Sequence, residues 1–342
     1  MALATDFKDT SGVKVGIYKE DTLGDGGLQG ATTGWILPTI EIPEIHPISV
    51  PLQEAPKIYN GRRHPAIQDW NTMLSHGQML DVTIKCICTP TVADLFCLAM
   101  MEDGSGANTI EMNYERFLQL GDGDSITESW GIYVQDGGWG EAGADKGYYG
   151  CVAKSMEISH SADAEAGLPI ITMVFTTGYA PVLDDALTDG DVVFAGSSTL
   201  DDVETAPAFS TWVEADTWIG SNASSCEVLP YEYTLTISRN FLPVTQPVVG
   251  GWQTVNGYAM DGNIGANMSM TFKRDSNLAN FNAHFRDNSR TEMQIGDGSL
   301  WNIWINGKVT NTTIDSGNSE FRQSVSIFGT YSANATFVSV EF

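Results

Sequence analysis

The stretch Leu80-Asp-Val-Thr-Ile-Lys-Cys-Ile-Cys88 decides the fold class, because its buried-type residues recur at every second position. This alternation is typical of a β-strand with one buried face. The next residues, Thr89-Pro90-Thr-Val-Ala-Asp-Leu-Phe-Cys-Leu-Ala-Met-Met101, predict a short helix. Thr89 is a favourable N-cap, and Pro90 suits the first helical turn. An apolar stripe at helical spacing follows, formed by Val92, Leu95, Phe96 and Ala99.

Strand-like alternation recurs along the chain, between stretches rich in glycine or proline. The expected strands cover residues 13–17, 35–42, 129–135, 150–159, 169–177, 231–238, 267–273, 301–309, 319–329 and 335–341. Residues 136–149 hold five glycines and predict a loop. A second short helix is expected over residues 276–286, with Ser276 as its N-cap.

The two halves of the chain follow one plan, which indicates an internal duplication. The segments that align are 35–42 with 228–235, 82–85 with 270–273, the helix after 89 with the helix after 276, 131–134 with 301–304, and 156–159 with 325–328. A chance resemblance between two β-rich halves is the alternative. The sequence therefore predicts a mainly β fold, a β-sandwich or barrel with one short flanking helix per domain, in two similar tandem domains.

Composition shifts give the expected boundaries. Residues 1–34 predict an N-terminal arm or loop, 35–182 a first β domain, 183–227 an acidic linker or insertion, and 228–342 a second β domain. Within the first domain, closely spaced prolines exclude a helix or central strand, so residues 43–70 predict an extended loop. A loop of this length in a compact domain is usually functional.

The charge balance excludes tight nucleic-acid binding. The 342-residue chain has 17 Lys plus Arg against 43 Asp plus Glu, a net charge of −26, whereas nucleic-acid binding needs basic residues that release counterions. Such a charge fits a self-repelling soluble surface, or a surface that a polyanion passes without sticking. No signal peptide or membrane-spanning apolar run is visible, so we expect cytoplasmic synthesis and no membrane contact.

No motif for catalysis is visible, and we expect no enzyme, no cofactor and no metal. The glycine-rich runs lack phosphate-loop spacing, and the five histidines form no zinc motif. Three alternatives stay open: Cys86, Cys88 and Cys97 as metal ligands or buried thiols, Asp122-Gly-Asp124 as a weak calcium site or a solvated turn, and the nine tryptophans as a sugar platform or packing residues.

Several segments resemble tail tube (major tail) proteins of long-tailed bacteriophages, two-domain type. They are Val15-Gly-Ile-Tyr-Lys-Glu-Asp-Thr-Leu-Gly24, Trp35-Ile-Leu-Pro38, Tyr231-Glu-Tyr-Thr-Leu-Thr-Ile-Ser-Arg-Asn240 and Gly262-Asn-Ile-Gly-Ala-Asn-Met-Ser-Met-Thr-Phe-Lys-Arg274. The resemblance covers both halves as a match of overall plan. The acidic segment 183–227 departs from the simplest members.

The resemblance implies a structural virion protein, located in the tail and assembled in the host cytoplasm. Its partners would be further copies of itself, in stacked trimeric pseudo-hexameric or hexameric rings, and other tail proteins such as the tape measure and tail terminator. DNA would pass through without specific binding. Another phage structural role, in capsid decoration or the tail tip, and a carbohydrate-binding β-protein are the alternatives. We expect the contacts between rings or subunits at Lys57, Arg62, Arg63 and Trp70, on the 43–70 loop.

Overall fold

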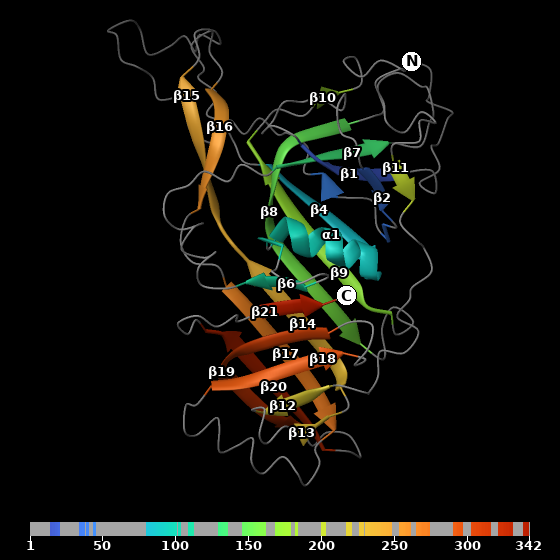
Figure 1. Cartoon of the computed structure of the whole chain (residues 1–342), viewed down its shortest axis with the longest axis vertical. Coiled ribbons are helices and arrows are strands. Elements are labelled where there is room, and N and C mark those ends of the chain that lie inside the picture. The colour runs from blue at the N-terminus through green and yellow to red at the C-terminus, as the bar shows by residue number, and fades with distance from the viewer. Residues whose placement is uncertain are drawn as a thin grey trace, which may run out of the picture.

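The computed structural model describes residues 14–20, 34–37, 39–40, 44–45, 80–100, 102–103, 109–112, 129–135, 146–161, 168–178, 182–183, 200–202, 217–220, 226–228, 230–247, 253–260, 265–273, 290–296, 302–315, 321–330 and 338–341. Over these residues the fold is mainly β, as the sequence predicts, and α1 (Pro90–Met100) is the one helix described. All described strands except β15 and β16 belong to one connected sheet system (Figure 1).

In the first half, strands pair in an order that differs from their order along the chain. β3 (Glu44–Ile45) pairs with β4 (Leu80–Ile87), β4 with β9 (Ile170–Thr177), β9 with β8 (Lys146–Ser161), β8 with β7 (Trp130–Gln135), and β7 with β1 (Lys14–Lys19). These pairings are all antiparallel. β1 also pairs with β2 (Gly34–Leu37), which pairs in parallel with β11 (Leu200–Asp202).

The second half repeats this order. β14 (Pro230–Ser238) pairs with β17 (Gly265–Lys273), β17 with β20 (Arg322–Gly329), β20 with β19 (Asn302–Asp315), β19 with β18 (Arg290–Gly296), and β18 with β12 (Trp218–Gly220). All of these pairings are antiparallel. β12 also pairs with β13 (Cys226–Glu227).

Each half thus contains one long strand, and the two long strands have neighbours in equivalent positions. Along its first part, β8 lies between β7 and β10 (Val182–Leu183), and β19 lies between β18 and β21 (Val338–Glu341). Both long strands have a register shift further on, which skips Lys154 in β8 and Thr310 in β19. A β-bulge of this kind bends a strand and increases its twist. The pairing therefore makes β7 equivalent to β18, and β8 to β19.

This equivalence corrects two details of the sequence alignment. The alignment matched residues 131–134 of β7 with 301–304 and residues 156–159 of β8 with 325–328, whereas pairing order equates them with β18 and β19. The alignment missed β18 and so shifted each later strand by one. Residues 82–85 and 270–273 lie in β4 and β17, which both hold the second place in their halves, so here the alignment matches equivalent strands.

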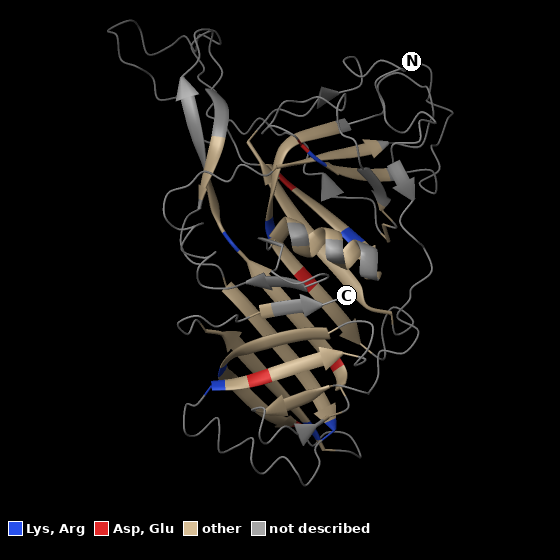
Figure 2. Cartoon of the chain, in the orientation of Figure 1, with Lys and Arg blue, Asp and Glu red and all other residues tan. Residues whose placement is uncertain are grey.

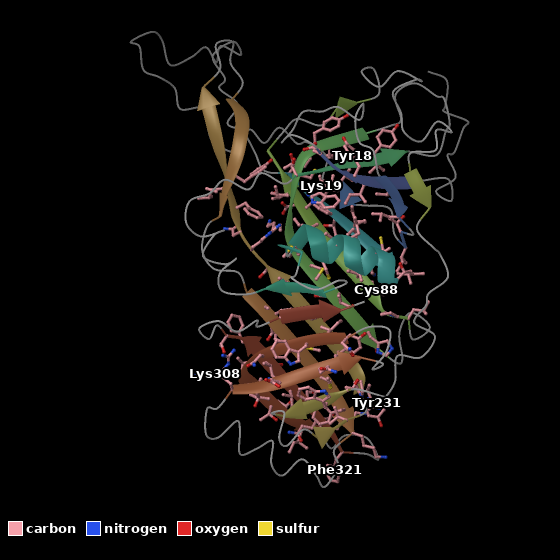
Figure 3. All side chains as sticks on the ribbon, in the orientation of Figure 1. Tyr18, Lys19, Cys88, Tyr231, Lys308 and Phe321 are labelled. Carbon is pink, nitrogen blue, oxygen red and sulfur yellow. The ribbon has the colours of Figure 1, made fainter. Side chains whose placement is uncertain are left out.

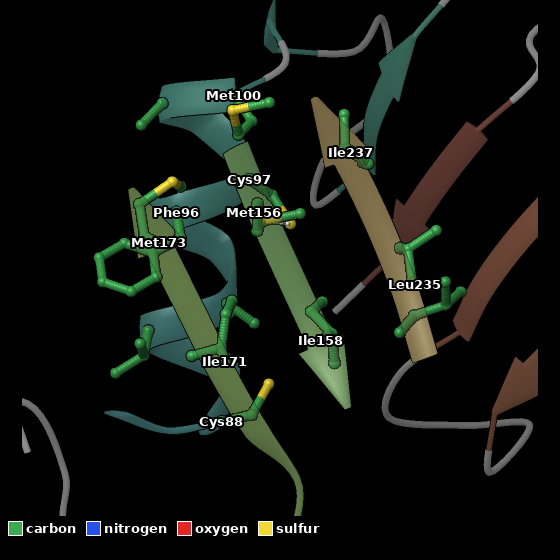
Figure 4. Packing of buried hydrophobic residues seen from close by; sticks show 14 of the residues in the cluster. Cys88, Phe96, Cys97, Met100, Met156, Ile158, Ile171, Met173, Leu235 and Ile237 are labelled. Carbon is green, nitrogen blue, oxygen red and sulfur yellow. Dashed lines mark hydrogen bonds between the residues drawn. The ribbon is translucent and has the colours of Figure 1, made fainter. Parts of the chain in front are cut away.

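The two halves are joined through β8 and β14, which pair over Ser155–Ser161 and Glu232–Ser238. Their apolar residues face one hydrophobic cluster that contains side chains of both halves. Figure 4 shows Met156 and Ile158 of β8 between residues of β9 and α1 on one side and Leu235 and Ile237 of β14 on the other. The core is therefore continuous across the boundary between the halves.

Helix α1 begins where the sequence predicts. The backbone N–H of Val92 donates to Thr89 Oγ1 at 3.2 Å, and that of Ala93 donates to the Thr89 carbonyl at 2.9 Å. These bonds satisfy donors that have no partner within the first helical turn. The predicted stripe is buried, with Val92 and Phe96 at 0% exposure. α1 contacts β8 and covers the core of the first half (Figure 1).

Five segments differ from the sequence expectation. β8 begins at Lys146, inside the predicted glycine-rich loop, and Tyr148 and Tyr149 are buried. β15 (Phe241–Pro247) and β16 (Gln253–Met260) form a hairpin that was not predicted. Residues 183–227 contribute β11 to the first half and β12 and β13 to the second, and 43–70 contributes β3. The short strands β5 (Glu102–Asp103) and β6 (Thr109–Met112) pair together, and β6 also pairs with β21. The predicted helix 276–286 lies outside the described residues.

Isoleucine to alanine substitutions at equivalent positions of β8 and β19 should lower the free energy of unfolding by different amounts. Ile158 and Ile314 each stand four residues beyond the skipped residue, but Ile158 is 0% exposed and Ile314 is 49% exposed. Ile158→Ala should lower the free energy of unfolding by about 2–5 kcal/mol, and Ile314→Ala by about 0.5 kcal/mol or less, in a dilute sample. Urea unfolding measures both. Equal losses would contradict the burial difference.

Candidate assembly surface

The four residues that the sequence analysis singled out, Lys57, Arg62, Arg63 and Trp70, lie outside the described residues. The structure therefore brings none of them into a described site. The described surface offers two other features that a partner could contact: a projecting hairpin, and exposed apolar side chains at the two ends of the β19–β20 pair.

The hairpin of β15 and β16 extends away from the rest of the sheet (Figure 1). Its strands pair from Phe241 opposite Met260 to Pro247 opposite Gln253. Pro243 and Pro247 would be unfavourable in a central strand. Proline is tolerated in edge strands, however, and both strands of an isolated hairpin are edges. The sequence signal for the hairpin is Gly250-Gly251 between two β-rich runs.

Arg239 fixes the point where the chain passes from β14 into the hairpin. Its guanidinium donates from Nε to the Ala153 carbonyl at 2.7 Å and from a terminal nitrogen to the Ala99 carbonyl at 2.7 Å. Ala99 lies in the last turn of α1, where the carbonyls lack helical partners and carry partial negative charge. The guanidinium also lies over the Phe241 ring, 4.9 Å from its centroid. One side chain therefore ties together α1, the bulge of β8 and β15.

Tyr258 holds the base of β16 against β8 and β9. Its hydroxyl donates to the Gly150 carbonyl at 2.7 Å and accepts from the Gly178 backbone N–H at 3.0 Å. Gly150 has a φ of 57°, a left-handed conformation that favours glycine. The side chain of Tyr258 is 0% exposed, and its ring packs edge-on against Phe241. The hairpin base is therefore a fixed part of the fold.

A buried carboxylate on the N-terminal strand meets the same segment of β8. Glu20, 5% exposed, accepts from the Gly150 backbone N–H at 2.9 Å and from the Ser129 hydroxyl. Its own backbone N–H donates to the Ser129 carbonyl at 2.9 Å. A buried carboxylate needs such donors to offset its lost hydration. The end of β1 is therefore held to β7 and β8 by a buried polar network.

Burial makes the thiols of Cys86, Cys88 and Cys151 poor reactive groups. Burial raises the pKa of the Cys86 and Cys88 thiols far above the usual range, and the pKa of Cys151 is raised by burial and by Glu20. A thiol in this state is rarely a thiolate, the form that binds metals. Among the described residues, no three His, Cys, Asp or Glu side chains are grouped as metal ligands.

Three exposed large apolar side chains lie on or beside β19 and β20. Ile314 at 49% and Phe321 at 60% exposure lie near one end of this strand pair, and Phe328 at 43% lies near the other. Figure 3 shows Phe321 at the end of the molecule opposite the hairpin. Elsewhere in the described part, Ile40 is 37% and Leu242 is 52% exposed. Few described strand residues are charged (Figure 2), and most acidic residues of the chain lie outside the described segments.

Comparisons with known proteins give structural likenesses only, since no family model and no curated protein matches the sequence. One similar chain, from a structure described as the virion of a native gene transfer agent particle, is 16% identical with a TM-score of 0.28; the match covers 36% of this chain and 95% of that chain. Another, from the tail of an empty gene transfer agent particle with C6 symmetry, is 14% identical with a TM-score of 0.28, over 34% and 92%. At these values neither likeness establishes a function. No described helix has the length and apolarity to span a membrane.

Removing the hydroxyl of Tyr258 should loosen the hairpin. Tyr258→Phe leaves the Gly150 carbonyl and the Gly178 N–H without this partner, which costs about 1–3 kcal/mol. We expect faster amide hydrogen exchange in β15 and β16 than in wild type, with unchanged exchange in β17 and β20. Equal acceleration in all four strands would show that the hydroxyl supports the whole fold.

Alkaline pH should destabilise the chain through its buried tyrosines. Burial, and to a lesser extent Cys151, raises the pKa of Tyr148 from 10.0 to about 12. Above pH 10 the unfolded chain loses this proton while the folded chain keeps it, so stability falls by up to about 1.4 kcal/mol per pH unit until pH 12. Urea unfolding at pH 8 and pH 11 should show a smaller loss for Tyr148→Phe than for wild type. An identical loss would contradict this assignment.

Proposed function

We propose that this chain is a structural subunit of a phage-like tail, and that it forms the stacked rings of a tail tube through which DNA passes. The observation that carries the proposal is the duplication: two halves with one strand order lie side by side in a continuous sheet, joined by β8 and β14. A chain built in this way presents the same kind of strand junction twice, which suits a closed ring of repeated units.

The sequence supports the same role. The segments at 15–24, 231–240 and 262–274 resemble tail tube proteins in both halves. Within the described residues, β14 and β17, which hold much of the last two segments, are adjacent in the sheet, and β1 holds part of the first segment. In this proposal the chain is not an enzyme and takes no cofactor. It lies in the virion tail after assembly in the host cytoplasm, with the tape measure and tail terminator as further partners.

The net charge of −26 fits a conduit for DNA. An acidic wall repels phosphates, and at physiological salt the effect reaches about 8 Å from the surface. DNA would thus slide without adhering. The basic residues Lys57, Arg62 and Arg63 lie on the predicted 43–70 loop. We propose that they contact the acidic surface of the next ring, and that Trp70 packs at the same contact.

Electron microscopy tests the proposal directly. Concentrated wild-type protein in negative stain should show rings and hollow tubes. A variant with Lys57→Glu, Arg62→Glu and Arg63→Glu should form rings but give fewer stacked tubes, by roughly tenfold or more. The reason is that like charges across a contact cost several kcal/mol.

The matched control keeps the charges: Lys57→Arg, Arg62→Lys and Arg63→Lys should still form tubes. Monomers alone in concentrated wild-type samples would overturn the tail role. Normal tubes from the charge-reversed variant would overturn only the assignment of the ring contact.

A further inference from the structure

The strand β8 has both edges occupied along its second part. β9 lies on one edge, with Met173 opposite Met156. β14 lies on the other edge, with Ile237 opposite the same Met156. That second edge is also the one that β7 occupies along the first part of β8. β14, the first strand of the second half's pairing order, therefore continues the line of β7.

The equivalent strand β19 lacks a described neighbour at one of these positions. β18 pairs with it from Asn302 to Lys308, as β7 does with β8, and β20 pairs with the other edge as far as Asp315. Beyond Lys308, no described strand continues the line of β18. The open stretch, residues 309–314, is the counterpart of the part of β8 that receives β14.

Side-chain exposure agrees with a missing neighbour. Ile158 lies opposite Leu235 of β14 and is 0% exposed, whereas its equivalent Ile314 is 49% exposed. Phe321, just before β20, is 60% exposed at the same end of the sheet. An open strand edge beside exposed apolar side chains pairs readily with another chain.

The complementary edge lies in the first half of the chain. β3 takes the place on β4 that β14 takes on β17, and Ile40 N–H donates to the Lys85 carbonyl just before it. β14 uses its other edge to bind β8, but no described strand lies on the other edge of β3. Ile40, 37% exposed, adjoins this edge. Each copy therefore carries one edge of each kind that has no partner strand in the described part of the chain.

We propose that β19 of one copy pairs through residues 309–314 with the edge formed by residues 39–40 and β3 of a second copy, in the antiparallel manner in which β8 pairs with β14. This inference rests on the proposed assembly role and names the lateral partner in it. The contact is head-to-tail, so it generates a ring if the rotation closes. Pairing of two β19 edges with each other would leave the β3 edge of each copy without a partner, and so it is disfavoured.

Mixed-variant cross-linking tests this contact. Ile40→Cys and Ile314→Cys are made on separate chains, both with Cys226→Ser, since the other four cysteines are buried. A short bismaleimide is added to each variant alone and to their mixture, after a thermal melt has shown that both variants fold. The mixture should give a covalent dimer at roughly tenfold or more above either variant alone, because pairing raises the effective concentration. Leu242→Cys, which is similarly exposed at 52%, replaces Ile40→Cys in the control mixture and should give no excess.

Light scattering on the same samples separates the possible failures. Oligomers without the 40–314 link, or equal linking in the control mixture, overturn this inference and leave the tail proposal standing. Absence of both oligomers and links overturns both. Links without rings or tubes in the microscope support the head-to-tail contact and overturn the tail role. Dimers from Ile314→Cys alone would show that two β19 edges pair instead.

Discussion

The antiparallel pairing of β8 with β14 is the interaction on which the rest of the structure depends, since it makes one sheet and one core out of two halves. The pairing places Leu235 opposite Ile158 and Ile237 opposite Met156, all of them buried. It also stacks the rings of His160 and Tyr233, whose centroids lie 5.4 Å apart. A one-residue slip in this register would turn each of these side chains to the opposite face, so the buried residues specify the register strongly.

Polar contacts at the C-terminal end of β14 set the direction of the chain as it leaves the pairing of β8 with β14. Arg239 follows directly after β14, and its bonds to Ala153 and Ala99 hold the turn against β8 and α1. A lysine would not reproduce this, because only the planar guanidinium can donate to two carbonyls while lying over the Phe241 ring. The hairpin therefore emerges at a fixed place, from which it extends away from the main sheet (Figure 1).

The duplication also explains how an unpaired edge arises. In the first half, the long strand is completed by the strand that begins the second half. In the second half, no described strand completes the long strand in this way, so its edge beyond Lys308 has no partner among the described residues. Natural sheets usually blunt such edges with charge, proline or a covering segment. Here residues 309–314 contain none of the first two, which is consistent with an edge reserved for a partner.

The sequence by itself determined the mainly β class, the position of α1 and the faces of β4, β14 and β17, because capping and two-residue periodicity are local signals. It also indicated the duplication. The alignment of the halves, however, matched β7 and β8 each to the strand after its true counterpart, because no local pattern marked β18 as a strand. Only the tertiary structure decided that 183–227 supplies strands to both halves, that β15 and β16 form a hairpin, and which edge stays open. Those features depend on pairing between residues far apart in the chain, and no local pattern encodes which strand will lie beside which.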